Sequence, residues 1–210
     1  MAGFDTSARG SITTLFKLLK NPDKMITLKK LIKARITVDR EGGNLTDVLT
    51  MDAITDLDYL QYCVKEGLRL DPPTGGSIDY KTTQNCTICD VPVPKGTTVW
   101  AGMQFLHIHP GIWQQPHSFL PERFDPESEL FKTPEGKNRH PLSHLPFSFG
   151  IRNCPGQVLA MLEMRVFIAY LLLKMDFELD LEPELEGIEH VSFQVSLPSK
   201  LHVRILKLNF

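Results

Sequence analysis

The chain has 210 residues, of which 23 are basic and 25 acidic, so its formal net charge at pH 7 is −2. This balance excludes the strongly basic surface of a typical nucleic-acid-binding protein, and we expect no nucleic-acid partner. The length suffices for one sizeable core, no run reaches the length of a membrane-spanning helix, and no signal peptide precedes the first helical pattern.

Three helices are predicted in the first third of the chain. In the first, apolar residues recur at helical spacing up to Lys20. Asn21-Pro22 is predicted to cap and open a second helix, whose apolar stripe includes Leu31. A third helix is expected from about Asp56 to Leu70, before a Pro-Pro pair that cannot continue it.

Short β-prone runs follow these helices. Thr87–Val93 and Thr97–Met103 predict a hairpin that turns at Pro94-Lys95-Gly96. After a meandering loop at residues 125–146, the apolar segment from Gln157 to Leu173 is predicted to be a buried helix, and Val191–Leu208 a terminal hairpin. The expected fold is therefore mainly α, with small β-hairpins.

The stretch from Phe147 to Gly156 contains the residues most typical of a functional site in this chain. Cys154 directly precedes a predicted helix, where unpaired backbone N–H groups and the helix dipole favour a thiolate. Gly150 and Gly156 let the backbone turn tightly and lie close to a flat ligand. Arg152 offers a rigid fork of donors suited to a carboxylate. An ordinary buried cysteine in a turn is the alternative.

This stretch matches Phe-x-x-Gly-x-Arg-x-Cys-x-Gly and resembles the haem-binding loop of the cytochrome P-450 family, the haem-thiolate monooxygenases. The resemblance implies that Cys154 is the axial ligand of the iron of haem b. It also implies that Arg152 pairs with a haem propionate and that Phe147 shields the sulfur. Gly150 and Gly156 would leave room for the macrocycle.

The first residues, Ala2-Gly3-Phe4-Asp5-Thr6-Ser7, resemble the oxygen-binding motif of the same family. There the motif lies near the middle of a long helix, and its acid–threonine pair interrupts the regular hydrogen bonding and relays protons to O₂. The resemblance gives these catalytic roles to Asp5 and Thr6, and places Ala2 and Gly3 against the cofactor. The alternative is a helix cap, since Asp and Thr are favoured at helix starts.

A Glu-x-x-Arg pair and a Pro-x-Arg-Phe segment extend the resemblance. Glu66 and Arg69 by themselves would be a surface ion pair worth under ~1 kcal/mol. In the family, however, such a pair forms a buried triad with a second arginine, here Arg123, that holds the cysteine loop in place. Many relatives bind the other haem propionate through an arginine in the segment that is here Pro73–Lys81, which contains none.

The resemblance covers essentially the whole chain, residues 1–210, as a single partial domain that corresponds to the C-terminal half of the family's fold. It implies a monooxygenase that activates O₂ reductively and inserts one oxygen atom into an apolar organic substrate, with electrons from NADPH through a reductase. The Pro-Glu-Arg-Phe segment suggests a eukaryotic type at the cytoplasmic face of the endoplasmic reticulum. Any membrane association would depend on the N-terminal half of the family's domain, to which this chain does not correspond.

Two other functions compete with this hypothesis. The isolated chain is expected to be inactive, as a non-catalytic haem-binding fragment, with parts of both its first helix and its apolar helix exposed. A zinc module would use Cys86, Cys89, His107 and His109, although the H-x-H pair is shorter than the usual spacing. The resemblance further implies that Leu197, at the tip of the terminal hairpin, contacts the substrate pocket.

Overall fold

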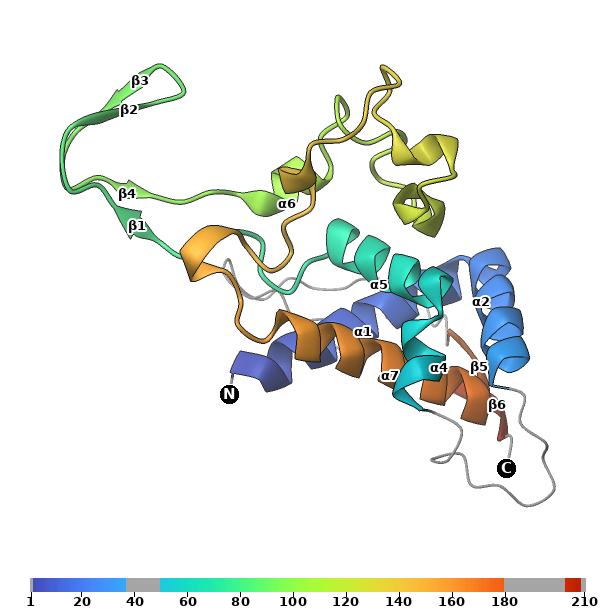
Figure 1. Ribbon diagram of the computed structural model, residues 1–210. Coiled ribbons are helices and arrows are strands. Elements are labelled where there is room, and N and C mark those ends of the chain that lie inside the picture. The colour runs from blue at the N-terminus through green and yellow to red at the C-terminus, as the bar shows by residue number, and fades with distance from the viewer. Residues whose placement is uncertain (1, 37–49, 180–202, 209–210) are drawn as a thin grey trace.

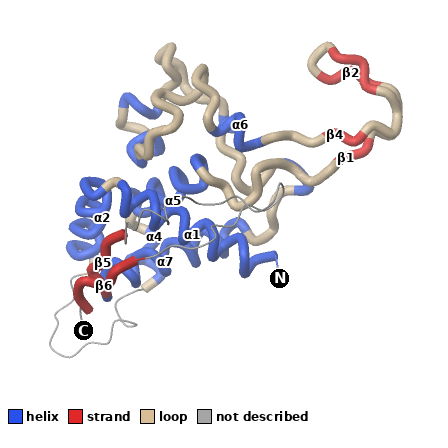
Figure 2. Tube along the Cα trace, turned by 180° about the vertical axis from the view of Figure 1, so that it is seen from behind, coloured by secondary structure: helices blue, strands red, loops and turns tan. Residues whose placement is uncertain are grey.

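The computed structural model describes residues 2–36, 50–179 and 203–208. A helical body carries irregular loops on one side, and an arm of short strands projects from it (Figures 1 and 2). The α-helices are α1 Ala2–Lys20, α2 Pro22–Arg35, α4 Met51–Thr55, α5 Asp58–Leu70, α6 Met103–His107 and α7 Gln157–Lys174. Single 3-10 turns are η1 Pro121–Phe124, η2 Glu129–Phe131, η3 Pro141–Ser143 and η4 Gly150–Arg152. In the described part of the chain, no helix has the length and apolarity to cross a membrane.

The junction between α1 and α2 differs from the prediction for Asn21. The Asn21 side chain makes no hydrogen bond to the start of α2; its amide instead donates to the carbonyl oxygen of Lys17, at 2.7 Å. Asn21 thus satisfies a carbonyl at the end of α1, where the last carbonyls lack helical partners. Pro22 opens α2 as predicted, whereas Leu31 is 39% exposed and lies outside the buried stripe.

The predicted third helix corresponds to α5, and a short helix that was not predicted, α4, precedes it. Thr50 caps α4, since its hydroxyl accepts a hydrogen bond from the backbone N–H of Ala53 at 3.2 Å. Asp56 ends α4 instead of starting α5: its backbone N–H bonds to the carbonyl of Asp52. The helix α5 begins two residues later and ends at Leu70, as expected.

The strands form three antiparallel pairs: β1 Tyr80–Lys81 with β4 Thr98–Val99, β2 Cys86–Ile88 with β3 Val91–Val93, and β5 Met175–Leu179 with β6 Val203–Leu208. The hairpin predicted to turn at Pro94-Lys95-Gly96 is wrong. The turn between β2 and β3 falls at Cys89 and Asp90, whose φ angles are 47° and 64°. Two consecutive positive φ angles produce a turn whose twist matches the strands it joins.

The core lies where α1, α5 and α7 meet, with α2 and β5 beside them. The closest approaches occur at glycines. A Cβ on Gly10 would lie 2.5 Å from Met164 Sδ of α7, and one on Gly67 would lie 2.2 Å from Thr14 Oγ1 of α1. The missing side chains therefore let α1 pack tightly against both other helices.

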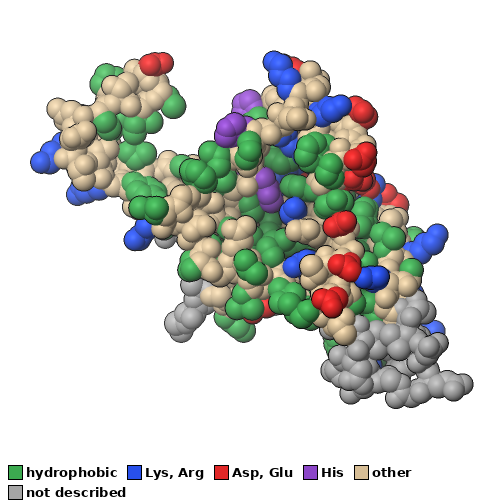
Figure 3. Space-filling model, in the orientation of Figure 1, with side chains coloured by type: hydrophobic (Ala, Val, Ile, Leu, Met, Phe, Trp, Pro, Cys, Tyr) green, Lys and Arg blue, Asp and Glu red, His purple; other side chains and the backbone are tan. Residues whose placement is uncertain are grey.

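The apolar helix α7 is buried on one face only. Met164, Ile168 and Leu172 are buried, whereas Val158 is 83% and Leu159 59% exposed. The helix predicted to be buried therefore buries one face only, because an apolar composition does not determine how many faces contact other elements. The expectation that this helix exposes apolar surface is confirmed. Hydrophobic side chains are visible over much of the molecular face in Figure 3, including the projecting arm.

Candidate functional site

Main-chain hydrogen bonds shape the loop that carries Cys154. The N–H of Cys154 donates to the carbonyl oxygen of Phe147 at 2.9 Å, and that of Asn153 donates to Gly150 at 3.1 Å. Ser148 and Gly150 have φ angles of 65° and 78°, so the backbone reverses sharply. The loop thereby places a half-buried Cys154 two residues before Gly156, the residue that precedes α7.

The surroundings of Cys154 fit a flat, largely apolar ligand. A Cβ on Gly150 would meet nothing within 4 Å, and one on Gly156 would lie 3.9 Å from the Cys154 sulfur. Ile151 is fully exposed, as are large parts of Phe149 and Val158. An iron porphyrin would need a thiolate to ligate its iron and apolar side chains to contact its ring. The loop offers a thiol near a helix start, exposed apolar side chains, and free space beside Gly150.

Two further residues of the predicted site, Arg152 and Phe147, differ in exposure. The guanidinium of Arg152 is exposed and makes no ion pair with any residue that the structure describes. It is therefore available to an anionic ligand group. Phe147 is half-buried and packs against the core cluster.

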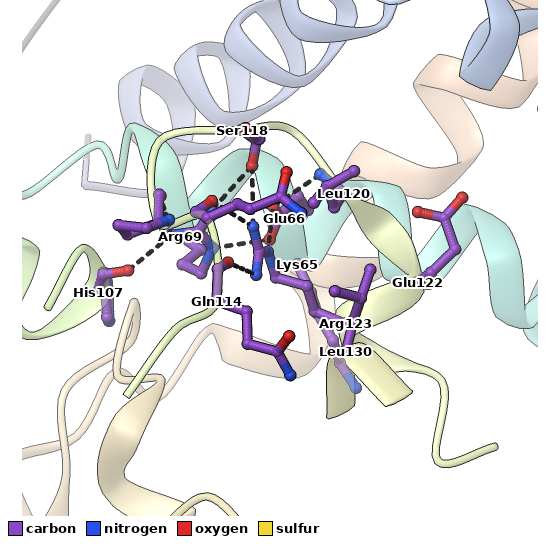
Figure 4. Close-up of polar contacts among 12 residues, drawn as sticks. Lys65, Glu66, Arg69, His107, Gln114, Ser118, Leu120, Glu122, Arg123 and Leu130 are labelled. Carbon is purple, nitrogen blue, oxygen red and sulfur yellow. Dashed lines mark hydrogen bonds and ion pairs between the residues drawn. The ribbon is translucent and has the colours of Figure 1, made fainter. Parts of the chain in front are cut away.

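Glu66, Arg69 and Arg123 form one buried triad (Figure 4). The two carboxylate oxygens of Glu66 accept hydrogen bonds from Arg69 Nε and Nη2 at 2.7 and 2.9 Å, and Arg123 Nε donates to Oε1 at 2.9 Å. All three side chains are fully buried. The cluster predicted from the resemblance is confirmed. Burial lowers the pKa of Arg123, and the carboxylate of Glu66 opposes this shift.

The triad also organises the segment from α6 to η1. Arg69 Nη1 donates to the carbonyl oxygens of His107 and Pro116, both at 2.7 Å. Arg123 donates to the carbonyls of Gln114 and Gln115. The two guanidinium groups, which supply up to ten donors, therefore fix the end of α6 and the loop backbone that follows it.

The N-terminal motif lies on the first two turns of α1. Asp5 is exposed, Thr6 is half-buried, and Gly3 has open space where a Cβ would stand. The helix α1 is continuous from Ala2 to Lys20, so the motif lies within helical backbone. Because α1 contacts α7 at Gly10 and Met164, both motifs belong to one packed unit.

Sequence reasoning missed the buried Arg9 and the half-buried Arg139. Arg9 of α1 donates to Asp71 at 2.8 Å, and both side chains are buried, which ties α1 to the end of α5. Arg139 stacks 4.4 Å from the centre of the Trp113 ring and donates to the carbonyl oxygen of Leu130 at 2.7 Å. No local pattern marks Arg9 or Arg139, because their partners Asp71 and Trp113 are distant in the sequence.

The zinc alternative does not fit the structure. Cys86 and Cys89 belong to the projecting hairpin, whereas His107 is fully buried and its Nε2 accepts a hydrogen bond from the backbone of Leu145. Within the described ranges, no three His, Cys, Asp or Glu side chains are grouped so as to hold a metal ion. The predicted terminal hairpin and Leu197 lie largely outside these ranges; residues 203–208 pair with β5.

Comparisons with known proteins agree with this geometry. The family model for cytochrome P450 matches residues 1–204. Cytochrome P450 4F12 of Homo sapiens is 36% identical over 176 residues, which are 83% of this chain and 31% of that protein. Cytochrome P450 4A24 of Sus scrofa is 31% identical over 207 residues, 98% of this chain and 37% of that protein.

A third relative is the leukotriene-B4 omega-hydroxylase 3 of Mus musculus, which is 32% identical over 178 residues, 82% of this chain and 30% of that protein. The chain spans about a third of the length of these relatives. The family match over nearly the whole chain, relatives above 30% identity, the buried triad and the cysteine loop together show that the chain belongs to the cytochrome P450 family.

Proposed function

We propose that this chain is the haem-ligating part of a monooxygenase, as a single partial domain. The observation that carries the proposal is the Cys154 loop: a half-buried thiol at the start of α7, beside an open glycine and exposed apolar side chains. When bound, haem would supply reductive activation of O₂ and insertion of one oxygen atom into an apolar substrate.

Each site residue has a defined part in this proposal. The Cys154 thiolate ligates the iron, and Arg152 neutralises a propionate of the porphyrin. Phe147 limits the access of water to the sulfur, and Gly150 and Gly156 leave the surface next to Cys154 clear for the ring. These roles require an exposed guanidinium and a half-buried thiol, as the structure has them.

The N-terminal motif supplies proton handling in the same proposal. Asp5 carries a carboxylate that exchanges protons with solvent, and the hydroxyl of Thr6 passes a proton onward at its Oγ1. Gly3, which has no side chain, lets the ring approach the start of α1 closely, next to Ala2. The half-buried position of Thr6 next to the exposed Asp5 suits an inward path for protons.

The relatives support a reaction class for the longer protein. One is named as a leukotriene-B4 omega-hydroxylase, which supports hydroxylation of an apolar substrate. Electrons would come from NADPH through a reductase, at the cytoplasmic face of the endoplasmic reticulum. Regions that are present in the relatives but not in this chain would provide the remaining substrate contacts and the membrane association.

A second candidate is a haem-binding fragment that does not turn over substrate. The exposed apolar face at the start of α7 and the exposed Asp5 favour it for the isolated 210-residue chain. Oxygenation needs a site from which water is excluded, and proton-handling groups that are held rigidly. Product formed per electron consumed, with haemin and a reductase, separates the candidates: uncoupled electron use identifies the fragment.

The test of ligation is Cys154→Ser in the haem-loaded protein. The reduced, carbon-monoxide-bound protein should lose its thiolate-type absorption band, because a serine hydroxyl does not replace a thiolate. Cys89→Ser, at an exposed cysteine on the projecting hairpin, is the control and should keep the band. A band that persists in Cys154→Ser would refute the assignment.

A further inference from the structure

His107, the last residue of α6, lies between the buried triad and the segment that leads to Cys154. Its carbonyl oxygen accepts a hydrogen bond from Arg69 Nη1 at 2.7 Å, drawn as a dashed line in Figure 4. Its ring atom Nε2 accepts another from the backbone N–H of Leu145 at 2.8 Å. One buried residue therefore contacts both the triad and the approach to the cysteine loop.

Main-chain hydrogen bonds continue from Leu145 to Cys154. The carbonyl oxygen of Leu145 accepts from the N–H of Ser148 at 3.1 Å, and that of Phe147 accepts from the N–H of Cys154 at 2.9 Å. Ser148 has a φ of 65°, which a residue with a Cβ adopts only when its surroundings hold it there. A hydrogen bond between a residue outside the loop and the backbone of Leu145 can therefore stabilise this turn.

The surroundings of His107 keep its ring uncharged at neutral pH. The ring is fully buried and its centre lies 5.3 Å from that of His144, whose Nε2 is 3.1 Å from the carbonyl oxygen of Lys65. Burial, and then the positive charge of Arg69, lower the pKa of His107 to about 4. Burial, with His107, Lys65 and Arg69, also lowers the pKa of His144 well below its usual value. The lone pair on Nε2 of His107 therefore remains available.

Packing alone does not explain an imidazole at this position. Because Nε2 accepts a hydrogen bond, the proton of the neutral ring resides on Nδ1. That nitrogen is buried and has no hydrogen-bond partner among the residues that the structure describes. Burying an unpaired donor is unfavourable, and an apolar side chain would fill the space without it. The contact from Nε2 to Leu145 offsets this loss.

We infer that His107 is a positioning residue for the cysteine loop: its Nε2 holds the backbone of Leu145 and so fixes the turn that presents Cys154. The link couples the Glu66–Arg69–Arg123 triad to Cys154 through one side chain and the backbone. The inference rests on the proposed function only where it concerns iron ligation, because the contact to Leu145 exists without a ligand.

Two substitutions that differ in the position of one acceptor test the inference. In His107→Gln the amide oxygen reaches the position of Nε2, whereas in His107→Asn it reaches only that of Nδ1. Hydrogen exchange of the peptide containing Leu145 is measured in the full chain, before haem is added. We expect exchange close to that of the unchanged chain in His107→Gln, and roughly tenfold faster in His107→Asn, since one buried hydrogen bond is lost.

His109→Asn is the control, because His109 is exposed and its Nδ1 accepts a hydrogen bond from the N–H of Gly111, at 3.1 Å. Equal exchange in both His107 variants, or faster exchange in His109→Asn as well, would overturn the inference. If His107→Asn does not fold, His107→Gln decides alone: exchange more than tenfold faster than in the unchanged chain would contradict a role for the acceptor.

Spectra of the haem-loaded variants then connect the contact to ligation. His107→Asn should show a smaller fraction of the thiolate-type carbon monoxide band, and His107→Gln should restore it. An unchanged band in His107→Asn would show that the turn does not control Cys154, and so would overturn the inference. Failure of the proposed function is distinct, because it appears as a retained band in Cys154→Ser.

Discussion

At the residue scale, buried charge is the main polar feature of this part of the family's fold. Glu66 lies between two arginines and also accepts a hydrogen bond from the backbone N–H of Leu120, at 2.9 Å. Its carboxylate therefore neutralises two guanidinium groups and supports the start of η1. A buried pair of this kind contributes little compared with apolar residues of equal volume, yet removal of one partner leaves a buried charge without compensation.

We accordingly predict that Glu66→Gln destabilises the protein by ~3–5 kcal/mol, because Arg69 and Arg123 lose their counter-charge in the interior. Denaturant unfolding followed by circular dichroism measures the change. Glu135→Gln is the matched control, since Glu135 pairs with Lys137 at 2.7 Å on the surface. That change should cost under ~1 kcal/mol. Similar losses in the two variants would contradict a special role for the buried triad.

At the element scale, close approach between helices positions the two ends of the site. The helix α1 carries the Asp5–Thr6 motif and contacts both α5, which carries the triad, and α7, which follows Cys154. The contact with α5 depends on Gly67, which faces Thr14 with no room for a methyl group. A glycine inside a helix is otherwise unfavourable, so its place here reflects tertiary packing.

Gly67→Ala should therefore destabilise the protein despite the higher helix propensity of alanine. The added Cβ would lie 2.2 Å from Thr14 Oγ1 and 3.0 Å from Thr14 Cα, so the backbone of α1 would have to move. Overpacking of this kind costs ~1–3 kcal/mol, measured by thermal or denaturant unfolding. Gly3→Ala in α1 meets nothing within 4 Å and serves as the control, with no loss expected. A neutral Gly67→Ala would mean that α1 and α5 pack less tightly.

At the scale of the whole molecule, apolar surface is concentrated at the start of α7 and on the neighbouring cysteine loop. Val158, Leu159, Phe149 and Ile151 are all more than half exposed. Exposed apolar side chains gathered on one surface favour association with another apolar surface. This surface therefore makes the isolated chain prone to self-association.

Val158→Glu should reduce self-association of the isolated chain, measured by sedimentation velocity at several protein concentrations. Val158 is 83% exposed and stands in the first turn of α7, where a carboxylate also favours the helix dipole. Ile26→Glu is the matched control, because Ile26 is 64% exposed on α2 and belongs to a different surface. If both changes reduce self-association equally, the cause is the added negative charge and not the loss of apolar surface on α7.

The sequence by itself determined the family, the positions of the four longest helices and the candidate residues of the site. The motifs around Cys154 and Asp5 are contiguous, and so is the helical periodicity of α1, α5 and α7, so a reader of the chain recognises them without coordinates. The triad was also predictable, although Arg123 is distant in sequence, because a Pro-x-Arg-Phe segment marks it.

Only the tertiary structure decided which faces and atoms meet. The turn between β2 and β3 lies at Cys89 and Asp90, both at positive φ without a glycine, and the local sequence did not predict it. The exposure of Val158 depends on which helices cover α7, and the contact between His107 and Leu145 joins residues far apart in sequence. Such features depend on long-range packing, whereas motifs and periodicity depend on neighbours along the chain.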